Sequence, residues 1–460
     1  MRRGFSLPAE RRAVKSDIEK AAAEIVKRLR DAGHEAYFAG GCVRDMVRGV
    51  EPEDIDIATS ARPEQVSALF PKTFEVGAQF GVVIVHAPEA DFEVATFRVE
   101  GAYVDGRHPE SVAFTGAAED VRRRDFTING MLYDPLADEV HDWVGGREDI
   151  ASRTVRTIGN PRDRFTEDKV RLLRAVRFAA RLGYAIEAET YAAMERMAPA
   201  IVQVSVERIR DELLRILTAD GAGRGLRLMH DIGLLEPILP EIEALVGVAQ
   251  PPQFHPEGDV FEHTCLMLDA ARSPSPELAM GILLHDVGKP PTRTFDERIR
   301  FNEHDAVGAE MAKTICRRLR FSNEQVERVT ALVTNHMRIC TAPSMRLGKL
   351  KRLLAMDHLD EHLELHRLDC LTSHGKLDVY DFIRAKKAEF TQEELRPTPL
   401  LNGRDLMAMG YRPGPRFGEI LSALEEEQLE GRLTDSESAE AWVRARFPMG
   451  QGEVQDGGTE

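Results

Sequence analysis

The sequence lacks the cysteine spacing of a disulfide-stabilised or zinc-binding domain. Only five cysteines occur in 460 residues, and no two of them form a Cys-x-x-Cys pair. Disulfide frameworks and thiolate zinc sites need cysteines at short, regular spacings. Both classes are therefore excluded, and the scattered thiols favour a reducing compartment such as the cytosol.

Long apolar runs and a signal-peptide core are also missing. No segment approaches the ~20 apolar residues that a membrane span needs, and the amino-terminal residues are polar. We therefore expect no membrane partner and a cytoplasmic location. Hydrophobic residues still make up 43% of the 460 positions, which suffices for several cores, and we expect three or four domains.

The chain has fewer basic than acidic residues. It contains 61 Lys and Arg residues and 77 Asp and Glu residues, for a net charge of −16. The acidity is uneven, because residues 421–460 hold ten acidic and only three basic residues. Basic residues concentrate at 122–124, at 171–181 and around 208–215. Such clusters predict a local track for phosphates, so RNA stays a candidate partner whose binding weakens as salt rises.

An Asp-x-Asp pair, Asp54 and Asp56, follows the glycine turn Gly40-Gly41. Side chains at i and i+2 of a strand leave the same face, so both carboxylates can hold one divalent metal or two close together. The glycine turn lets backbone amides approach a triphosphate, and Arg44 adds a charged contact. Metal ions held there would polarise the α-phosphate for in-line attack by a hydroxyl, which is the chemistry of a nucleotidyltransferase.

Glu93 is a candidate third carboxylate. It alternates with the apolar positions of an expected strand over residues 91–98, which directs it to the same edge as the two aspartates. A solvated acid on the outer face of that strand explains the pattern equally well.

Four charged residues recur every three positions: Asp168, Arg171, Arg174 and Arg177. This spacing predicts that they lie near one side of a helix, with apolar residues on another side. Without further context, such a ladder is ordinarily a solvated helix face.

A second chemically suggestive set lies beyond the boundary at residues 250–253. The His285-Asp286 doublet closes an apolar helix, and His263, His304, His336 and Asp369 lie on other helical segments. A single histidine on an apolar helix is usually a satisfied core residue. Imidazoles and carboxylates drawn from separate helices, however, form a mixed site suited to Mn, Ni, Fe or Mg.

Four further motifs follow the acids in order: RRRDFTING at 122–130, DWVGG at 142–146, RTIGNP at 156–161 and EDKVRLLRAVRFAA at 167–180. With these motifs the first half of the chain resembles the class II tRNA nucleotidyltransferase and bacterial poly(A) polymerase family, within the polymerase β superfamily. The order of the motifs is far more specific than any one of them.

The resemblance assigns roles to individual residues. Asp54 and Asp56 bind Mg²⁺ and act in catalysis with Glu93, and Asp168 and Arg171 pair with the edge of the incoming base. A carboxylate that accepts from an exocyclic amine and a guanidinium that donates to ring acceptors distinguish C and A from U and G. By the same resemblance, five residues contact the nucleotide's triphosphate or sugar: Gly41, Arg44, Arg124, Arg174 and Arg177.

The later histidines and aspartates resemble the HD superfamily of metal-dependent phosphohydrolases. By that resemblance the metal ligands are His263, His285, Asp286 and Asp369, Lys289 steadies a phosphate, and His304 and His336 complete a second position. Such domains also persist as scaffolds, so turnover at this site is left open.

The expected reaction is addition of C and A, as CCA or as the terminal A alone, to the 3′ end of tRNA from CTP and ATP without a nucleic-acid template. Residues 98–109 resemble the flexible element of enzymes that add A, which argues against an enzyme adding only CC. The acidic carboxy-terminal end and the HD residues argue against a poly(A) polymerase, which remains an alternative. An alternative of another class is an HD phosphohydrolase with a non-catalytic RNA-binding head.

The expected fold class is α+β, with a small mixed sheet in a nucleotidyltransferase head and an elongated all-helical body that includes the HD domain. We expect the head at residues 1–150, a helical neck for base recognition and RNA binding at 151–249, the HD domain at 250–390, a helical tRNA-binding region at 391–448 and a disordered tail at 449–460. The oligomeric state is not indicated.

Overall fold

The computed structural model describes residues 3–5, 16–74, 81–100, 112–251, 258–296 and 298–448. Most of the segment expected to be a flexible element, from residue 101 onward, and the expected tail at 449–460 lie outside the described residues. The chain divides into two compact units. Unit 1 comprises Met1–Ala244, Arg272–Pro276 and Arg318–Phe321, and unit 2 comprises Leu245–Ala271, Glu277–Arg317 and Ser322–Glu460.

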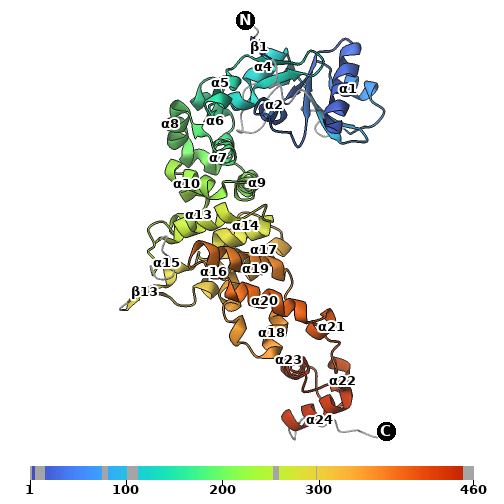
Figure 1. The fold of residues 1–460 in the computed structure, drawn as a ribbon, viewed down its shortest axis with the longest axis vertical. Coiled ribbons are helices and arrows are strands. Elements are labelled where there is room, and N and C mark those ends of the chain that lie inside the picture. Colours follow the sequence, from blue (N-terminus) through green and yellow to red (C-terminus); the bar gives the residue numbers. More distant parts are fainter. Residues whose placement is uncertain are drawn as a thin grey trace, which may run out of the picture. The chain divides into compact units, whose positions relative to one another are not determined.

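Unit 1 contains a mixed eight-stranded sheet in the order β1-β10-β9-β2-β3-β6-β5-β4 (Figure 1). Its strands are β1 (Arg3–Phe5), β2 (Ala36–Ala39), β3 (Asp56–Thr59), β4 (Thr73–Phe74), β5 (Val82–His86), β6 (Asp91–Thr96), β9 (Met131–Asp134) and β10 (Glu139–Asp142). The β3–β6 pair is parallel, and the other neighbouring strands are antiparallel. The strands β7 (Arg98–Glu100) and β8 (Val112–Phe114) pair separately.

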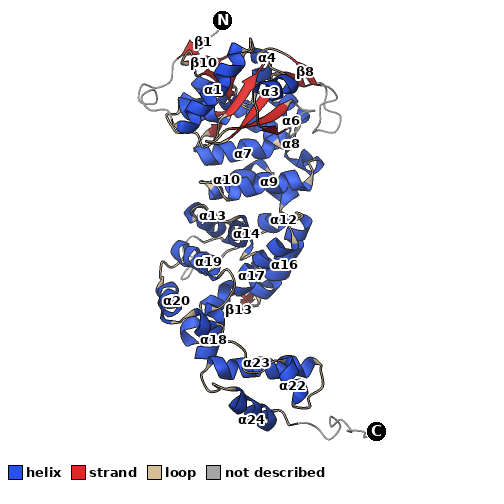
Figure 2. Ribbon diagram, turned by 90° about the vertical axis from the view of Figure 1, so that its right-hand side faces the viewer, coloured by secondary structure: helices blue, strands red, loops and turns tan. Residues whose placement is uncertain are grey.

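Strand β6 alternates as a sheet with one buried face requires. Phe92 and Val94 are buried while Asp91 and Glu93 are exposed, as expected for a strand with one solvated face. Helix α1 covers part of the sheet with apolar residues spaced three or four apart, among them Ile25 and Leu29. The predicted α+β head is therefore confirmed, and Figure 2 shows its strands in red among the first helices.

The helices of unit 1 are α1 (Asp17–Asp31), α2 (Gly41–Val47), α3 (Pro63–Leu69), α4 (Ala117–Arg122), α5 (Gly146–Ala151), α6 (Pro161–Glu167), α7 (Arg171–Leu182), α8 (Ala188–Met197), α9 (Val206–Leu217), α10 (Ala222–Ile232), α11 (Leu235–Ile238) and α12 (Pro240–Glu243). Helix α7 packs against both α9 and α10. Helices α9 and α10 also pack closely against each other, because a Cβ on Gly225 of α10 would lie 2.6 Å from Ile216 Cγ2 of α9. The short strands β11 (Thr154–Val155) and β12 (Ala185–Ile186) pair in parallel beside α7.

The described residues of unit 2 are helical apart from one hairpin, β13 (Arg293–Asp296) and β14 (Arg298–Phe301), which the sequence did not predict. Its helices are α13 (Val260–Ala270), α14 (Pro276–Leu284), α15 (Lys289–Thr292), α16 (His304–Arg318), α17 (Asn323–Ile339), α18 (Leu347–Leu354), α19 (Leu359–Thr372), α20 (Asp378–Glu389), α21 (Gln392–Leu395), α22 (Gly403–Ala408), α23 (Pro415–Leu429) and α24 (Ser436–Arg446). Helix α19 packs against α13 and α17. Within the described ranges, no helix is both long and apolar enough to cross a membrane.

Candidate functional site

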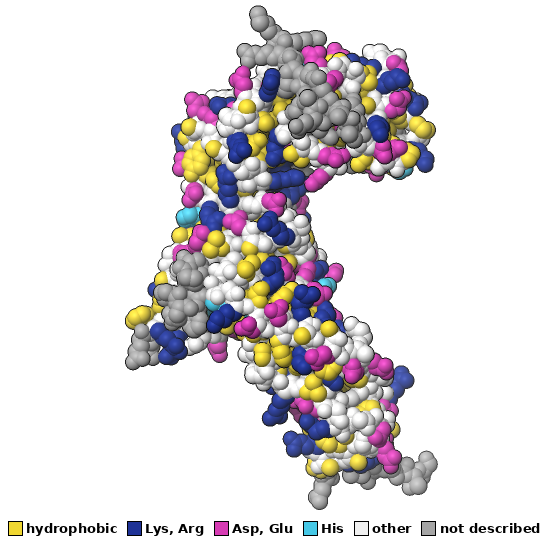
Figure 3. All heavy atoms as spheres, viewed as in Figure 1, with side chains coloured by type: hydrophobic (Ala, Val, Ile, Leu, Met, Phe, Trp, Pro, Cys, Tyr) yellow, Lys and Arg dark blue, Asp and Glu magenta, His cyan; other side chains and the backbone are white. Residues whose placement is uncertain are grey.

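A pocket of about 700 Å³ in unit 1 brings together residues from α2, β3, α7, α9 and the segments between them. All the residues that the sequence predicted for catalysis or nucleotide binding line it, except Glu93. They are Gly41, Arg44, Asp54, Asp56, Arg124, Asp168, Arg171, Arg174 and Arg177. On the face of unit 1 shown in Figure 3, Lys and Arg side chains gather in dark blue over the region of α7.

The acidic group lies where β3 meets the pocket. Asp56 is the first residue of β3 and pairs with Ala39 of β2, while Asp54 precedes the strand by two residues. The parallel register that aligns Ile57 with Val94 places Glu93 beside Asp56. Asp54 is therefore not a strand residue, although it still lines the same pocket as Asp56.

The negative charges at this edge repel one another. Burial, together with the charges of Asp54 and Glu93, raises the pKa of Asp56 to about 6, and Arg124 acts in the opposite direction. Carboxylates crowded in this way suit a hard divalent cation such as Mg²⁺, which prefers oxygen ligands. The three acids therefore fit the predicted metal, although Glu93 is exposed and lies outside the pocket lining.

Gly40 lies close to both Asp56 and Arg124 in the pocket. Gly40 has a φ of +79° at the start of α2. A Cβ there would lie 3.4 Å from Arg124 Nη1 and 3.7 Å from Asp56 Oδ2. Because larger residues rarely adopt this φ, the turn needs glycine.

Carboxylates and one aromatic ring position the arginine side chains. Arg174 donates to Asp125 Oδ2 at 2.6 and 2.8 Å, and Arg177 donates to Glu212 at 2.8 Å. The ring of Phe178 lies 4.5 Å from the Arg177 guanidinium and 5.5 Å from that of Arg174. The electron-rich face of the ring attracts both cations. The guanidinium groups thus have defined positions before a nucleotide arrives.

The predicted base-reading pair is not on one helix. Asp168 has an extended backbone (φ −147°, ψ 107°) that ends α6, and α7 begins only at Arg171. The prediction that Asp168 shares a helix face with Arg171, Arg174 and Arg177 was therefore wrong for Asp168. The break lets its carboxylate accept from the Val170 amide at 3.1 Å and from Arg208 at 2.6 Å.

Arg171 is held separately from Asp168. Its guanidinium donates to Glu167 Oε2 at 2.6 Å and to the Arg164 carbonyl at 3.0 Å. Only about a tenth of the side chain is exposed, and it still lines the pocket.

The sequence analysis did not identify several pocket residues as site residues, chiefly Asp125, Asn129 and Glu212. Arg44 donates to Asn129 Oδ1 at 3.0 Å, so Asn129 positions a predicted phosphate contact. A signal existed for Glu212, because it lies three residues from Ile209 and four from Ile216 on the inner face of α9. An acid in an apolar stripe needs a buried partner, and here the partner is Arg177.

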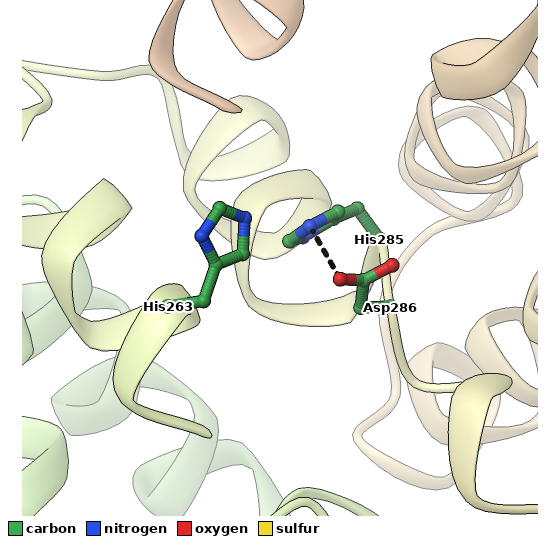
Figure 4. Close-up of side chains that lie close together, drawn as sticks. All are labelled: His263, His285 and Asp286. Carbon is green, nitrogen blue, oxygen red and sulfur yellow. Dashed lines mark ion pairs between the residues drawn. The ribbon is translucent and has the colours of Figure 1, made fainter. Parts of the chain in front are cut away.

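Four histidines of unit 2, His263, His285, His304 and His336, form one cluster around Asp286. Figure 4 shows His263 and His285 directed toward a common space with the Asp286 carboxylate. His285 Nε2 lies 3.1 Å from Asp286 Oδ2, and on the other side His304 Nε2 lies 3.5 Å from Asp286 Oδ1. Two groups have ligand atoms within 4.8 Å of one another: His263, His285 and Asp286, and Asp286, His304 and His336.

Backbone carbonyls orient three of these imidazoles. The Nδ1 atoms of His285, His304 and His336 lie 2.8, 2.8 and 2.6 Å from the carbonyl oxygens of Ile282, Phe301 and Val333. Since a carbonyl only accepts, each Nδ1 carries the proton and each Nε2 is left with a lone pair. Metal-ligating histidines show this arrangement, so the cluster fits a divalent metal.

The ionisation states of His336 and Asp286 also suit metal binding. Burial lowers the pKa of His336 to about 4, with a further contribution from His285, so this imidazole is neutral near pH 7. Burial alone raises the pKa of Asp286, but His285 and Lys289 outweigh it and hold the pKa well below the ordinary carboxyl value. A neutral imidazole and an ionised carboxylate are the forms that bind metals.

Asp369, the remaining predicted ligand, lies on α19 and contacts the cluster through His263, with 3.1 Å between Asp369 Oδ1 and His263 Nε2. Lys289 Nζ lies 2.6 Å from Asp286 Oδ2. The structure therefore brings together every residue that the sequence predicted for this second site.

The Asp125–Arg174 ion pair predicts a pH-dependent stability. Burial opposes ionisation of Asp125, but Arg174 outweighs it and lowers the pKa below the ordinary value of 3.8. A depressed pKa stabilises the folded protein above the unfolded-state pKa, and this contribution is lost as the pH falls. We expect Asp125→Asn to lower the free energy of unfolding at pH 7 by about 1–3 kcal/mol, less than for a fully buried pair because Arg174 is partly exposed.

Urea unfolding of both proteins at pH 7 and at pH 3.5 measures this effect, and the difference between them should shrink at the lower pH. Asp211→Asn is the matched control, because Asp211 pairs with Arg210 at an exposed position and is worth less than about 1 kcal/mol at either pH. A difference for Asp125→Asn that is equal at both pH values would contradict the expectation.

Three family models match the chain in the order of its elements. The poly A polymerase head domain matches residues 36–156, the probable RNA and SrmB-binding site of polymerase A matches 183–245, and the HD domain matches 260–372. The first match covers β2 to β11, and the third covers α13 to α19 with all the clustered histidines.

Solved structures have the same fold. The structure of a Bacillus stearothermophilus CCA-adding enzyme in complex with CTP has a TM-score of 0.73 and 29% identity, covering 94% of this chain and 98% of that one. A CCA-adding enzyme in complex with ATP has a TM-score of 0.64 at 19% identity, which supports the fold alone.

Proteins named CCA-adding enzyme are also related in sequence. That of Geobacillus stearothermophilus is 45% identical over 46% of this chain, a region that spans only 52% of the relative. That of Streptococcus suis strain 05ZYH33 is 31% identical over 90% of this chain and 93% of the relative. With similarity along nearly its whole length, and with a polymerase-type head followed by an HD domain, the chain belongs to the CCA-adding enzyme family.

Proposed function

We propose that the protein is a tRNA nucleotidyltransferase that adds C and A to the 3′ end of tRNA from CTP and ATP, without a nucleic-acid template. The observation that carries the proposal is the single pocket lined by two of the acids, the arginine side chains and the base-reading pair. Related solved structures are complexes with CTP, with ATP and with tRNA, which supports the same substrates.

In this proposal Asp54, Asp56 and Glu93 would hold Mg²⁺. When bound, the metal would supply charge stabilisation at the α-phosphate and favour attack by the tRNA hydroxyl. Arg44, Arg174 and the other pocket arginines neutralise the phosphates, and their prior pairing with acids limits the reorganisation that binding requires.

Asp168 and Arg171 select the base in the same scheme. A carboxylate has about four acceptor positions, so Asp168 retains capacity for an exocyclic amine while Val170 and Arg208 orient it. Arg171 donates to the ring acceptors of C or A. The domain boundaries 1–150, 151–249, 250–390 and 391–448, and the cytoplasmic location, remain predictions beside this proposal.

The first experiment measures incorporation of each labelled nucleotide into tRNA transcripts that lack A, CA or CCA, in the presence of Mg²⁺. We expect C and A on the matching ends and no extended poly(A). Asp54→Ala should lower the rate more than about 100-fold, because even groups that only support a metal ligand typically cost 10- to 100-fold.

Asp91→Asn is the matched control, because Asp91 is exposed on β6 and pairs with His86. It should retain the parent rate. A long run of A would favour the poly(A) polymerase alternative. Absence of any incorporation by the parent protein, with cleavage of a cyclic phosphodiester, would favour the HD phosphohydrolase with a non-catalytic head.

Asp168→Ala provides a separate test of base selection. Loss of the carboxylate removes the acceptor for the exocyclic amines that distinguish C and A from U and G. We expect preference for CTP and ATP over UTP and GTP to fall by about 10- to 100-fold, as for loss of a bidentate base contact. Competition between labelled nucleotides on one transcript measures this ratio, and an unchanged ratio would remove Asp168 from base selection.

A second candidate function, metal-dependent phosphohydrolysis, is favoured by the convergence of the Nε2 atoms of His285, His304 and His336 on Asp286. The metal would be Mn, Ni, Fe or Mg, and it supplies an activated water when bound. The chain's residues hold that metal and, through Lys289, a phosphate.

For this site, elemental analysis of purified His285→Ala should show at least one divalent metal fewer per chain than the parent protein. His374→Ala is the control, because His374 is exposed and lies outside the cluster. Equal metal content in the parent protein and in His285→Ala would disprove the metal site.

A further inference from the structure

A single buried carboxylate holds three residues of the pocket in unit 1. Asp120, on α4, is only 1% exposed and is not among the residues that line the pocket. Its Oδ1 atom accepts from the Arg98 backbone amide at 3.2 Å and from Arg123 Nε at 2.9 Å, and its Oδ2 atom accepts from Arg124 Nη2 at 3.0 Å. All three of these arginines line the pocket.

Helix geometry explains why Asp120 reaches two guanidinium groups. Side chains three and four positions apart lie on the same side of a helix. Arg123 and Arg124 follow Asp120 at these spacings, where α4 ends. Burial alone opposes ionisation of Asp120, but Arg124 and Arg123 outweigh it and lower the pKa below the ordinary value of 3.8. The carboxylate is therefore ionised near neutral pH, and both of its bonds to guanidinium groups are charge-assisted.

Arg124 has a second acidic neighbour with which it does not pair. A Cβ on Gly40 would lie 3.4 Å from Arg124 Nη1 and 3.7 Å from Asp56 Oδ2, so both groups border the same methyl-sized space. The Arg124 charge is close enough to act on the pKa of Asp56. In the part of the chain that the structure describes, however, Arg124 forms its ion pair with Asp120 and none with Asp54 or Asp56. An unrestrained guanidinium at this position would pair with Asp56 and compete with a cation for it.

We propose that Asp120 is a positioning residue, which holds Arg124 away from Asp56 and so keeps the acidic edge of the pocket open to a divalent cation. The same restraint keeps the Arg124 charge in the pocket, where it is available to a nucleotide phosphate. Asp120 acts through Arg124 and not as a ligand, because it is buried and does not line the pocket. The inference rests on the proposed nucleotidyl transfer and adds the residue that separates the cation position from this guanidinium group.

The test measures Mn²⁺ binding to the full-length protein by electron paramagnetic resonance, without nucleotide or turnover. Mn²⁺ is the probe because carboxylate oxygens suit it as they suit Mg²⁺. The binding that is lost in Asp54→Ala belongs to the acidic edge. We expect Asp120→Asn to weaken this binding about tenfold, as for loss of a group that supports a metal ligand, because the released Arg124 pairs with Asp56.

A double-mutant cycle separates an effect through Arg124 from a structural effect. Arg124→Gln alone should bind Mn²⁺ at least as tightly as the parent protein, because a positive charge beside the acids is gone. In the Arg124→Gln background, Asp120→Asn should change Mn²⁺ binding by less than about twofold, since no guanidinium is left to be released. A merely structural role of Asp120 would weaken binding equally in both backgrounds.

Asp134→Asn is the matched control. Asp134 is also buried in unit 1, and it accepts from Arg30 at 2.7 Å and from two backbone amides. Neither Asp134 nor Arg30 lines the pocket. The variant should therefore leave Mn²⁺ binding unchanged even where it lowers the stability of the protein.

Each other result overturns the inference. Parent-like Mn²⁺ affinity in Asp120→Asn, or equal weakening in both backgrounds of the cycle, would show that Asp120 does not act by restraining Arg124. Weaker binding in Arg124→Gln than in the parent protein would show that Arg124 supports the cation position, and this result does not depend on the folding of Asp120→Asn. A parent protein that incorporates nucleotides but gives one of these results removes the inference alone. A parent protein that incorporates no nucleotide removes the proposed transferase function and the inference with it.

Discussion

Electrostatic repulsion among Asp54, Asp56 and Glu93 is the constraint around which the pocket of unit 1 is organised. The sheet register fixes the separation of Asp56 and Glu93, so the acids cannot move apart to relieve it. Burial, together with the charges of Asp54 and Glu93, raises the pKa of Asp56. Arg174 and Arg177 line the same pocket, and Asp125 and Glu212 restrain them, so these guanidinium groups do not collapse onto the crowded edge.

Both candidate sites orient their polar side chains through hydrogen bonds to other groups of the protein. In unit 1, Asp125 and Glu212 hold guanidinium groups, and in unit 2, backbone carbonyls hold imidazoles. In both cases one end of a polar side chain is bonded to the protein, and the other end is directed toward a ligand. Pre-organisation of this kind is what separates a binding site from a solvated group of charges.

Much of both sites was predictable from the sequence. The spacing of Asp54 and Asp56, the glycine turn and the ordered motifs indicated the head, and the His285-Asp286 doublet with its distant partners indicated the second cluster. The break at Asp168 was not predictable, because a three-residue period continues through it and only the extended backbone of that residue ends α6. The role of Asp125 depends on its contact with Arg174, many positions away in the chain, which no local pattern encodes.

The sharing of Asp286 between two ligand groups links them thermodynamically. Under the proposed metal binding, a cation in one group would withdraw electron density from the bridging carboxylate and add positive charge beside the other group, so a second cation would meet a weaker ligand. The two positions would then behave as a single coupled equilibrium with unequal affinities, and metal availability in the cell would set whether the domain carries one ion or two.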